Sequence, residues 1–220
     1  MSQNDNAGAG TLEVHDLEPS NANYLGEIIE GLGKSQKCLP SKLFYDENGS
    51  ELFEKICELD AYYLTRTELA IMQQYASAMA ARIGSGAVLI ELGSGASVKT
   101  RILLDHLASP AAYVPVDISR EHLRQTAETI HQDYEALQVS PVCADFTTAF
   151  ELPNDVDAAA PRTVYFPGST IGNFAPASRL ALLRNVRAIC RDEGAMLIGF
   201  DRKKDIETIE AAYNDEDGVT

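Results

Sequence analysis

The chain lacks the features that mark several protein classes. Its 220 residues contain no tryptophan, and 18 Lys and Arg residues stand against 33 Asp and Glu residues, for a formal net charge of −15. Proteins that grip a nucleic-acid backbone need a basic face, so this balance argues against that class. No apolar run approaches the roughly 18 residues of a membrane span, and no signal-peptide pattern opens the chain. With 45% hydrophobic residues, we expect a globular cytoplasmic protein that binds neither nucleic acid nor a membrane.

The cysteine and histidine residues also lack the spacing of a metal site. The four cysteines, Cys38, Cys57, Cys143 and Cys190, are far apart and form no CxxC pair. None of the four histidines has a cysteine or carboxylate companion at ligand spacing. The sequence therefore predicts free thiols in a reducing compartment and no metal.

What the sequence does contain is a regular alternation that starts near residue 87. Short apolar runs occur at 87–92, 112–117, 139–145, 162–168 and 195–201, and helical patterns separate them at 97–108, 119–137 and 177–191. Such alternation predicts an α/β fold with a doubly wound parallel sheet, in which Ser119 caps the middle helix. Sheets of this kind bind ligands beyond the carboxyl ends of their strands.

The first third of the chain is less regular. We expect disorder over residues 1–18, a helix within 19–37 that Gly33 stops, and a turn at Asp46 followed by a short helix. A longer helix is predicted over 67–83. Thr65 and Glu68 fit a capping box at its start, and Gly84 is its expected end.

The strand ends carry the residues that can hold a cofactor. The first apolar run leads into "ELGSG", where Gly93 and Gly95 allow a sharp turn and a close backbone approach to a ligand. Asp117 ends the second run, 24 residues after Gly93. An acid in that position can accept both hydroxyls of an adenosine ribose.

Two cofactor classes share this geometry, the nicotinamide dinucleotides and S-adenosylmethionine. Val98 stands where the dinucleotide motif has its third glycine, and the chain shows no Tyr-x-x-x-Lys arrangement or catalytic histidine, so an oxidoreductase is the less favoured alternative. Lys99 can pair with the carboxylate of adenosylmethionine. After the third run, Asp145 can accept from an adenine amino group and Phe146 can lie against the ring.

Several segments together resemble one family. "FYDENGSELFEKICELDAYYLTRTE", "ELGSGASVKTRILLDHL", "YVPVDIS", "CADF", "FPGSTIGNF" and "AYNDEDGVT" occur here in the order found in the histidine-specific, adenosylmethionine-dependent methyltransferases. The similarity extends over about residues 20–220. It implies a class I (Rossmann-like) methyltransferase fold and Nα-trimethylation of L-histidine to hercynine, a step of ergothioneine biosynthesis.

The resemblance also implies roles for individual residues. The cofactor residues would be Gly93, Lys99, Asp117, Asp145 and Phe146. The substrate residues would be Tyr62, Gly168, Asn173 and Tyr213, with Tyr62 and Asn173 beside the reacting amine. Residues 19–66 would begin a substrate-binding domain, 67–201 would form the cofactor-binding core, and 202–220 would start an inserted segment of the substrate domain.

The family members continue where this chain stops, at Thr220, so the resemblance implies an incomplete substrate domain. The residues that grip the imidazole ring would lie beyond this point, which leaves N-methylation of another amino acid open. A chain that binds the cofactor without turnover is a second alternative. We expect a monomeric full-length parent, whereas this chain exposes the strand predicted at 195–201 and would self-associate.

Overall fold

The computed structural model describes residues 12–17, 24–215 and 218–220, and a parallel sheet forms its centre. The strand order is β1-β4-β3-β2-β5-β6, and every described pairing is parallel. The strands are β1 (His15–Asp16), β2 (Val88–Leu92), β3 (Ala112–Asp117), β4 (Val142–Cys143), β5 (Arg162–Phe166) and β6 (Ala195–Ile198). The predicted doubly wound parallel sheet is confirmed.

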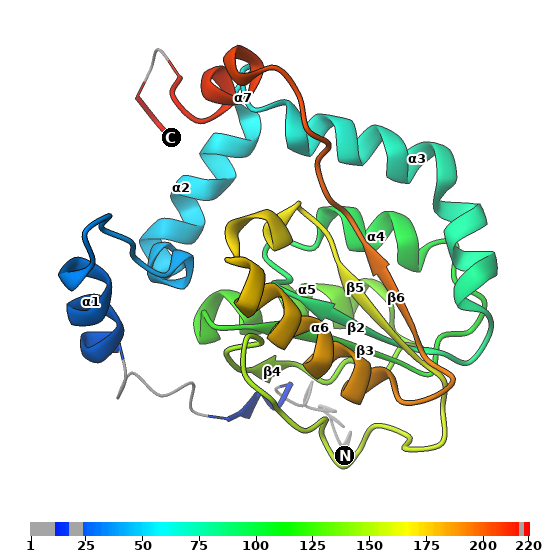
Figure 1. The fold of residues 1–220 in the computed structure, drawn as a ribbon. Coiled ribbons are helices and arrows are strands. Elements are labelled where there is room, and N and C mark those ends of the chain that lie inside the picture. The colour runs from blue at the N-terminus through cyan, green and yellow to red at the C-terminus, as the bar shows by residue number, and fades with distance from the viewer. Residues whose placement is uncertain (1–11, 18–23, 216–217) are drawn as a thin grey trace, which may run out of the picture.

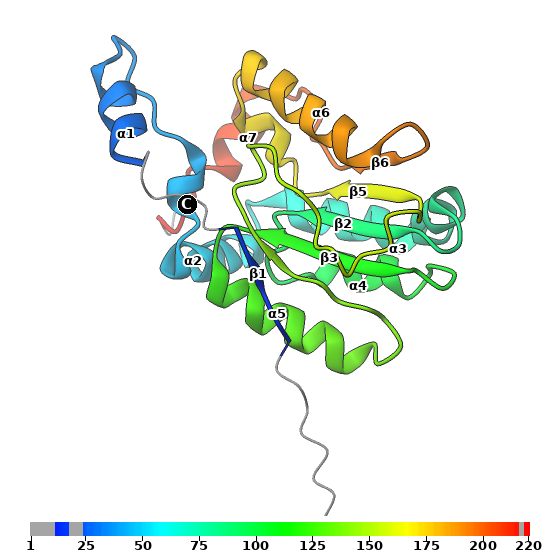
Figure 2. The same cartoon turned by 90° about the horizontal axis from the view of Figure 1, so that it is seen from below.

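Side chains alternate between two apolar cores on the two faces of the sheet. Along β2, Val88, Ile90 and Leu92 join one core, whereas Leu89 joins the other. The first core is covered by α6 (Pro176–Cys190), and the second by α3 (Tyr63–Ile83), α4 (Val98–Leu104) and α5 (Arg120–Asp133). Figures 1 and 2 show the resulting three layers, with helices on both faces of the sheet.

At the centre of the sheet, next to β2, the order in which the chain adds strands reverses. β2 pairs with β3 on one side and with β5 on the other. The chain therefore runs outward through β3 and β4, then returns to β5 on the opposite flank. The loops after β2 and β5 diverge there, and open parallel sheets bind ligands at such a point of the carboxyl edge, the edge where the parallel strands end.

The remaining helices lie beyond the carboxyl edge or beside it (Figure 1). They are α1 (Tyr24–Gly33), α2 (Glu47–Glu58) and α7 (Ile206–Ala212), with a 3₁₀ helix at Ser41–Phe44. α1 ends at Gly33 as predicted. The Asp46 carboxylate caps α2 by accepting from the Gly49 N–H at 2.8 Å.

Two local predictions are wrong, and a third, the N-cap at Ser119, is confirmed in position only. Thr65 and Glu68 do not form a capping box, because α3 already begins at Tyr63, and Glu68 bonds elsewhere. Ser119 precedes α5 as expected but its side chain makes no capping bond. Within the segment expected to be disordered, His15 and Asp16 form β1 against β4, whereas residues 1–11 and 18 lie outside the described residues.

No helix in the described part of the chain is both long enough and apolar enough to cross a membrane.

The last strand, β6, forms one edge of the described sheet, and this edge allows a test of self-association. β6 pairs with β5 alone, and the Gly199 N–H donates to Phe166 O at 3.0 Å. The alternation of a parallel ladder then turns the N–H groups of Met196 and Ile198 outward. We expect the 220-residue chain to self-associate through these groups as its concentration rises.

Met196→Pro removes one outward N–H and should shift the chain toward monomer, since proline is tolerated at sheet edges. Met196→Ala keeps the N–H and is the matched control. Light scattering over a concentration series measures both variants. A wild-type chain that stays monomeric throughout, or equal effects of Pro and Ala, would contradict edge pairing.

Candidate active site

The turn after β2 has the backbone shape that the glycine-rich motif predicts. Gly93 and Gly95 take φ values of 70° and 47°, and Ser97, which precedes α4, takes 53°. The N–H groups of Gly93 and Ser94 both donate to Val116 O on β3, at 2.8 and 3.3 Å. The turn is thereby fixed against the neighbouring strand. Gly93 and Gly95 have left-handed backbones, which glycine adopts with less strain than any residue that carries a side chain.

Asp117 lies at the end of β3, next to this turn. One carboxylate oxygen accepts from the Gly95 N–H at 3.2 Å and the other from the Ser119 N–H at 3.0 Å. A carboxylate has about four lone-pair positions, so two remain for an incoming donor. The side chain is oriented at the place where the sequence expects a ribose.

Phe146 and Asp145 follow β4 on the same edge. Phe146 packs edge-to-face on Phe166 at a centroid distance of 5.6 Å, and a Cβ built on Gly93 would lie 3.6 Å from Phe146 Cε1. The glycine turn and this ring are therefore neighbours, as a shared adenosine site requires.

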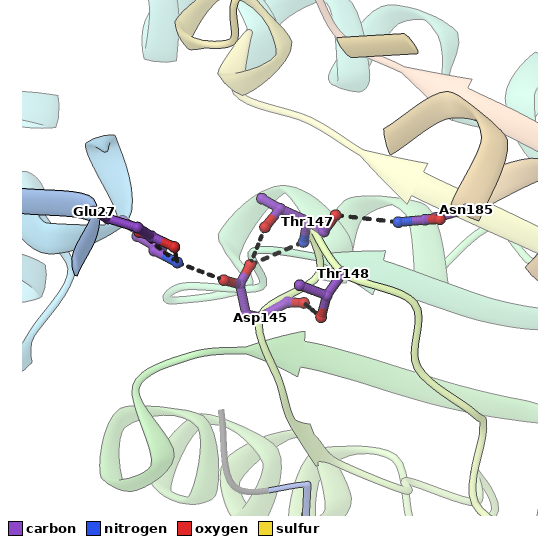
Figure 3. Close-up of polar contacts among 6 residues, drawn as sticks. Glu27, Asp145, Thr147, Thr148 and Asn185 are labelled. Atoms are coloured by element: carbon purple, nitrogen blue, oxygen red, sulfur yellow. Dashed lines mark hydrogen bonds and ion pairs between the residues drawn. The ribbon is translucent and has the colours of Figure 1, made fainter. Parts of the chain in front are cut away.

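Asp145 makes contacts that the sequence did not predict. One oxygen accepts from Lys42 Nζ at 3.0 Å, and the other accepts from the N–H and hydroxyl of Thr147. Figure 3 shows the carboxylate between Glu27 of α1 on one side and Thr147 on the other. Although burial alone would raise it, the pKa of Asp145 is lowered, because Thr147 and Lys42 donate to the charged form.

Lys42 is the residue that closes this side of the site. Its ammonium also bonds Glu27 at 3.0 Å and lies 5.1 Å from the centroid of the Tyr24 ring. Burial would lower the pKa of Lys42, but the bonds to Asp145 and Glu27 raise it. Lys42 lies in the short 3₁₀ helix Ser41–Phe44, 103 residues from Asp145, and the sequence gave no signal for this contact.

Lys99 and Gly168 meet at a single acid, Glu68. Lys99 Nζ donates to Glu68 Oε2 at 2.6 Å, and the Gly168 N–H donates to both Glu68 oxygens at 3.0 and 2.9 Å. Sequence reasoning assigned Glu68 to a helix cap and missed this contact. A carboxylate near Lys99 and opposite the Gly168 turn was not inferable from local spacing.

Asn173 ends the 3₁₀ helix Thr170–Asn173 that follows the Gly168 turn. Gly168 and Ser169 both have left-handed backbones, with φ values of 82° and 59°. The Asn173 side chain is exposed and makes no hydrogen bond to the described residues. Its amide is thus free to contact a ligand above β5.

Tyr62 and Tyr213 contact each other away from the sheet. Their rings pack edge-to-face at 5.7 Å, and Phe53 packs against Tyr62 at 6.2 Å. Tyr62 is 5% exposed, whereas Tyr213 is 52% exposed. Burial first, and then the neighbouring Tyr213, raise the pKa of Tyr62, so its hydroxyl stays protonated. The two tyrosines that the resemblance pairs at one substrate are in contact.

A buried polar network supports the glycine turn from below. Glu91 of β2 is 2% exposed and accepts from the Thr100 hydroxyl at 2.6 Å and from the Tyr113 hydroxyl. The Tyr113 hydroxyl is also 3.1 Å from Ser97 Oγ. Burial raises the pKa of Glu91 to about 7, against the two hydroxyl bonds, which lower it. These contacts tie the start of α4 to two strands.

The comparisons with known proteins decide the family. A model described as histidine-specific, SAM-dependent methyltransferases matches residues 24–220. The chain belongs to this family. A histidine N-alpha-methyltransferase from Mycobacterium tuberculosis is 38% identical over 217 residues, which cover 93% of this chain and 66% of that protein. Its counterpart from Mycolicibacterium smegmatis is 36% identical over 212 residues, covering 90% of this chain and 65% of that protein.

The chain thus spans about two thirds of the length of these two family members. Among solved structures, a possible exported protein from Bordetella parapertussis aligns with a TM-score of 0.52 and 17% identity. That alignment covers 71% of this chain and 59% of that one. At this identity the match shows a shared fold alone. The resemblance read from the motifs is confirmed by the family match, whereas a partial second domain stays a prediction.

The residues at the carboxyl edge fit the family's cofactor. Gly93 has a φ of 70°, which strains any residue with a side chain, and the buried Ser94 hydroxyl has no hydrogen-bond partner among the described residues. Asp117 retains acceptor positions, and Lys99 retains N–H donors beyond the one used on Glu68. Asp145 fits less simply, because Lys42 already donates to the oxygen nearest α1.

The Glu91 network makes a pH-dependent prediction. Because the folded pKa is near 7 and the ordinary value is 4.5, the folded state holds a proton that the unfolded state releases in this interval. The resulting stability is fully present below about pH 4.5 and is lost as the pH rises through about 7. The upper limit is about 3 kcal/mol.

Glu91→Gln mimics the protonated acid and should therefore gain stability relative to wild type between pH 5 and pH 8. Urea unfolding of both proteins at the two pH values measures the difference. An equal difference between variant and wild type at both values would show that Glu91 does not titrate there.

Proposed function

We propose that the full-length protein transfers methyl groups from S-adenosylmethionine to the α-amine of L-histidine, producing hercynine for ergothioneine biosynthesis. The observation that carries the proposal is the convergence of the family's motif residues at one sheet edge. Gly93, Lys99, Asp117 and Gly168 all lie at strand ends or in the turns and helix that follow them. Two relatives that are 38% and 36% identical to this chain bear the name histidine N-alpha-methyltransferase.

The cofactor supplies a methyl group on a cationic sulfonium. The chain's own residues bind and orient: Asp117 accepts from the ribose, Phe146 packs on the adenine, and Lys99 pairs with the carboxylate. Transfer to nitrogen is an in-line displacement that needs no covalent enzyme intermediate. Proximity and orientation alone can contribute about 7–11 kcal/mol to such a reaction in the best cases.

The amino acid would lie between the Gly168 turn and the tyrosine pair. The Asn173 carbonyl can accept one N–H of a neutral amine and leave the lone pair pointing at the methyl group. The hydroxyls of Tyr62 and Tyr213 can donate to the carboxylate of the amino-acid substrate. Because both hydroxyls are neutral, they add no charge of their own to the aromatic cluster. Because Tyr62 remains protonated well above neutral pH, it acts here as a donor and not as a base.

The finer assignments belong to the same proposal. The enzyme acts on a free amino acid in the cytoplasm, the complete gene product is a monomer, and residues 19–66 and 202–220 contribute to its substrate domain.

Asp117 offers a direct test of cofactor binding. Asp117→Ala should weaken S-adenosylhomocysteine binding by roughly 1–3 kcal/mol, because two hydroxyl donors lose a charged acceptor. Asp117→Asn keeps an acceptor for the Ser119 N–H and serves as the control for turn geometry. Calorimetry on the purified chain measures both variants. Tight binding of NAD, with no binding of S-adenosylhomocysteine, would overturn the cofactor assignment.

Asn173 separates the substrate role from a purely structural one. In the complete gene product, Asn173→Ala should reduce methyl transfer to histidine at least 100-fold and leave cofactor affinity within about threefold, since the amide touches the amine alone. Mass spectrometry counts the methyl groups added, and calorimetry gives the affinity. Equal losses of methyl transfer and of cofactor affinity would show that Asn173 has a structural role in the turn and no specific role toward the amine.

A panel of amino acids in the same assay tests selectivity. We expect trimethylhistidine as the main product. Preferential methylation of a different amino acid would retain the N-methyltransferase assignment and replace its substrate.

A further inference from the structure

Glu68 occupies a central place in the site and has no role in the function proposed so far. It lies in the second turn of α3, just after the aromatic cluster of Tyr62, and its carboxylate reaches the carboxyl edge of the sheet. There it accepts from Lys99, on the helix after β2, and from Gly168, in the turn after β5. Glu68 therefore links the two segments, after β2 and after β5, that diverge at the centre of the sheet.

The backbone around the carboxylate leaves space for it. A Cβ added to Gly199, which follows β6, would lie 1.9 Å from Glu68 Oε1. Any side chain at position 199 would therefore displace the acid. Gly168 has a left-handed backbone and presents its N–H to both oxygens. Segments after three strands thus meet at one carboxylate.

The Glu68 carboxylate is half-enclosed, and its contacts come from two other segments. The side chains of Glu68 and Lys99 are only 18% and 22% exposed, and the ion pair between them is 2.6 Å long. The carboxylate accepts three hydrogen bonds, one from the Lys99 ammonium and two from the Gly168 N–H. Glu68 is therefore suited to hold other groups in place.

The groups that it holds belong to the two halves of the reaction. Under the proposed function, Lys99 pairs with the cofactor carboxylate, and the Gly168 turn leads to Asn173 beside the amine. An ammonium has three donors, so Lys99 can bond Glu68 and still bind a second carboxylate. Displacement at a methyl group depends steeply on the relative position of donor and acceptor.

We propose that Glu68 is a positioning residue that sets the cofactor and the amino-acid substrate at the correct distance from each other, acting through Lys99 and the Gly168 backbone. The inference rests on the proposed function. Glu68 touches neither reacting atom, and its effect is to fix two binding groups from one anchored helix.

The test compares three variants of the complete gene product. Glu68→Ala removes the anchor, Glu68→Gln keeps an acceptor for the Gly168 N–H but loses the charge, and Gln73→Ala is an exposed control on the same helix. We expect kcat to fall at least 100-fold in Glu68→Ala and about tenfold in Glu68→Gln. The affinity for S-adenosylhomocysteine should fall about tenfold in Glu68→Ala, and the control should match wild type.

A double variant tests whether the effect passes through Lys99. Combined with Lys99→Met, Glu68→Gln should cause no further loss of S-adenosylhomocysteine affinity, because the group through which it acts is gone. If the losses of S-adenosylhomocysteine affinity in the two single variants add in the double variant, Glu68 does not act through Lys99. A Glu68→Ala protein with wild-type kcat, or one whose loss of kcat follows its loss of thermal stability, would overturn the inference itself.

Failure of the proposed function has a different signature. A wild-type protein that neither binds S-adenosylhomocysteine nor methylates an amino acid would refute that function, whatever the variants do. A wild-type enzyme that does both, with variants that behave as the control, would refute the role of Glu68 alone.

Discussion

The ion pair between Glu68 and Lys99 connects the parts of this molecule that must act together. Glu68 belongs to the long helix that starts at the aromatic cluster, whereas Lys99 belongs to the helix that follows the glycine turn. The same carboxylate holds the Gly168 N–H. A displacement of α3 would therefore affect both Lys99 and the Gly168 turn, which under the proposed function serve the cofactor and the amino acid.

Two further polar groups give this edge a fixed shape. Below the glycine turn, Glu91 holds Thr100 and Tyr113 within the core, at the cost of burying an acid whose pKa rises to about 7. At the far side, Lys42 joins α1 to Asp145. Buried or half-buried charges are expensive unless each has partners, and at these three places the partners come from different elements. The polar contacts thus specify how separate segments meet.

Much of this arrangement could be predicted because it follows from the sheet. Buried parallel strands read as continuous apolar runs, and their ends share one edge, so Gly93, Asp117 and Phe146 could be placed together before any contact was known. The contacts of Glu68 and Lys42 could not. The pattern from Thr65 to Glu68 fits a helix cap locally, yet the partner of the acid is Gly168, 100 residues away. Lys42 follows no periodic pattern, and β1 is too short for alternation to reveal.

Under the proposed function, the cofactor and the amino acid are held together at the carboxyl edge, across the loops after β2 and β5. Amide hydrogen exchange with and without S-adenosylhomocysteine plus histidine tests this claim at each segment. We expect slower exchange over residues 93–99, 117–119, 145–147 and 168–173 when both ligands are present. Slowing confined to another region, such as the surface loop at 149–158, would contradict it.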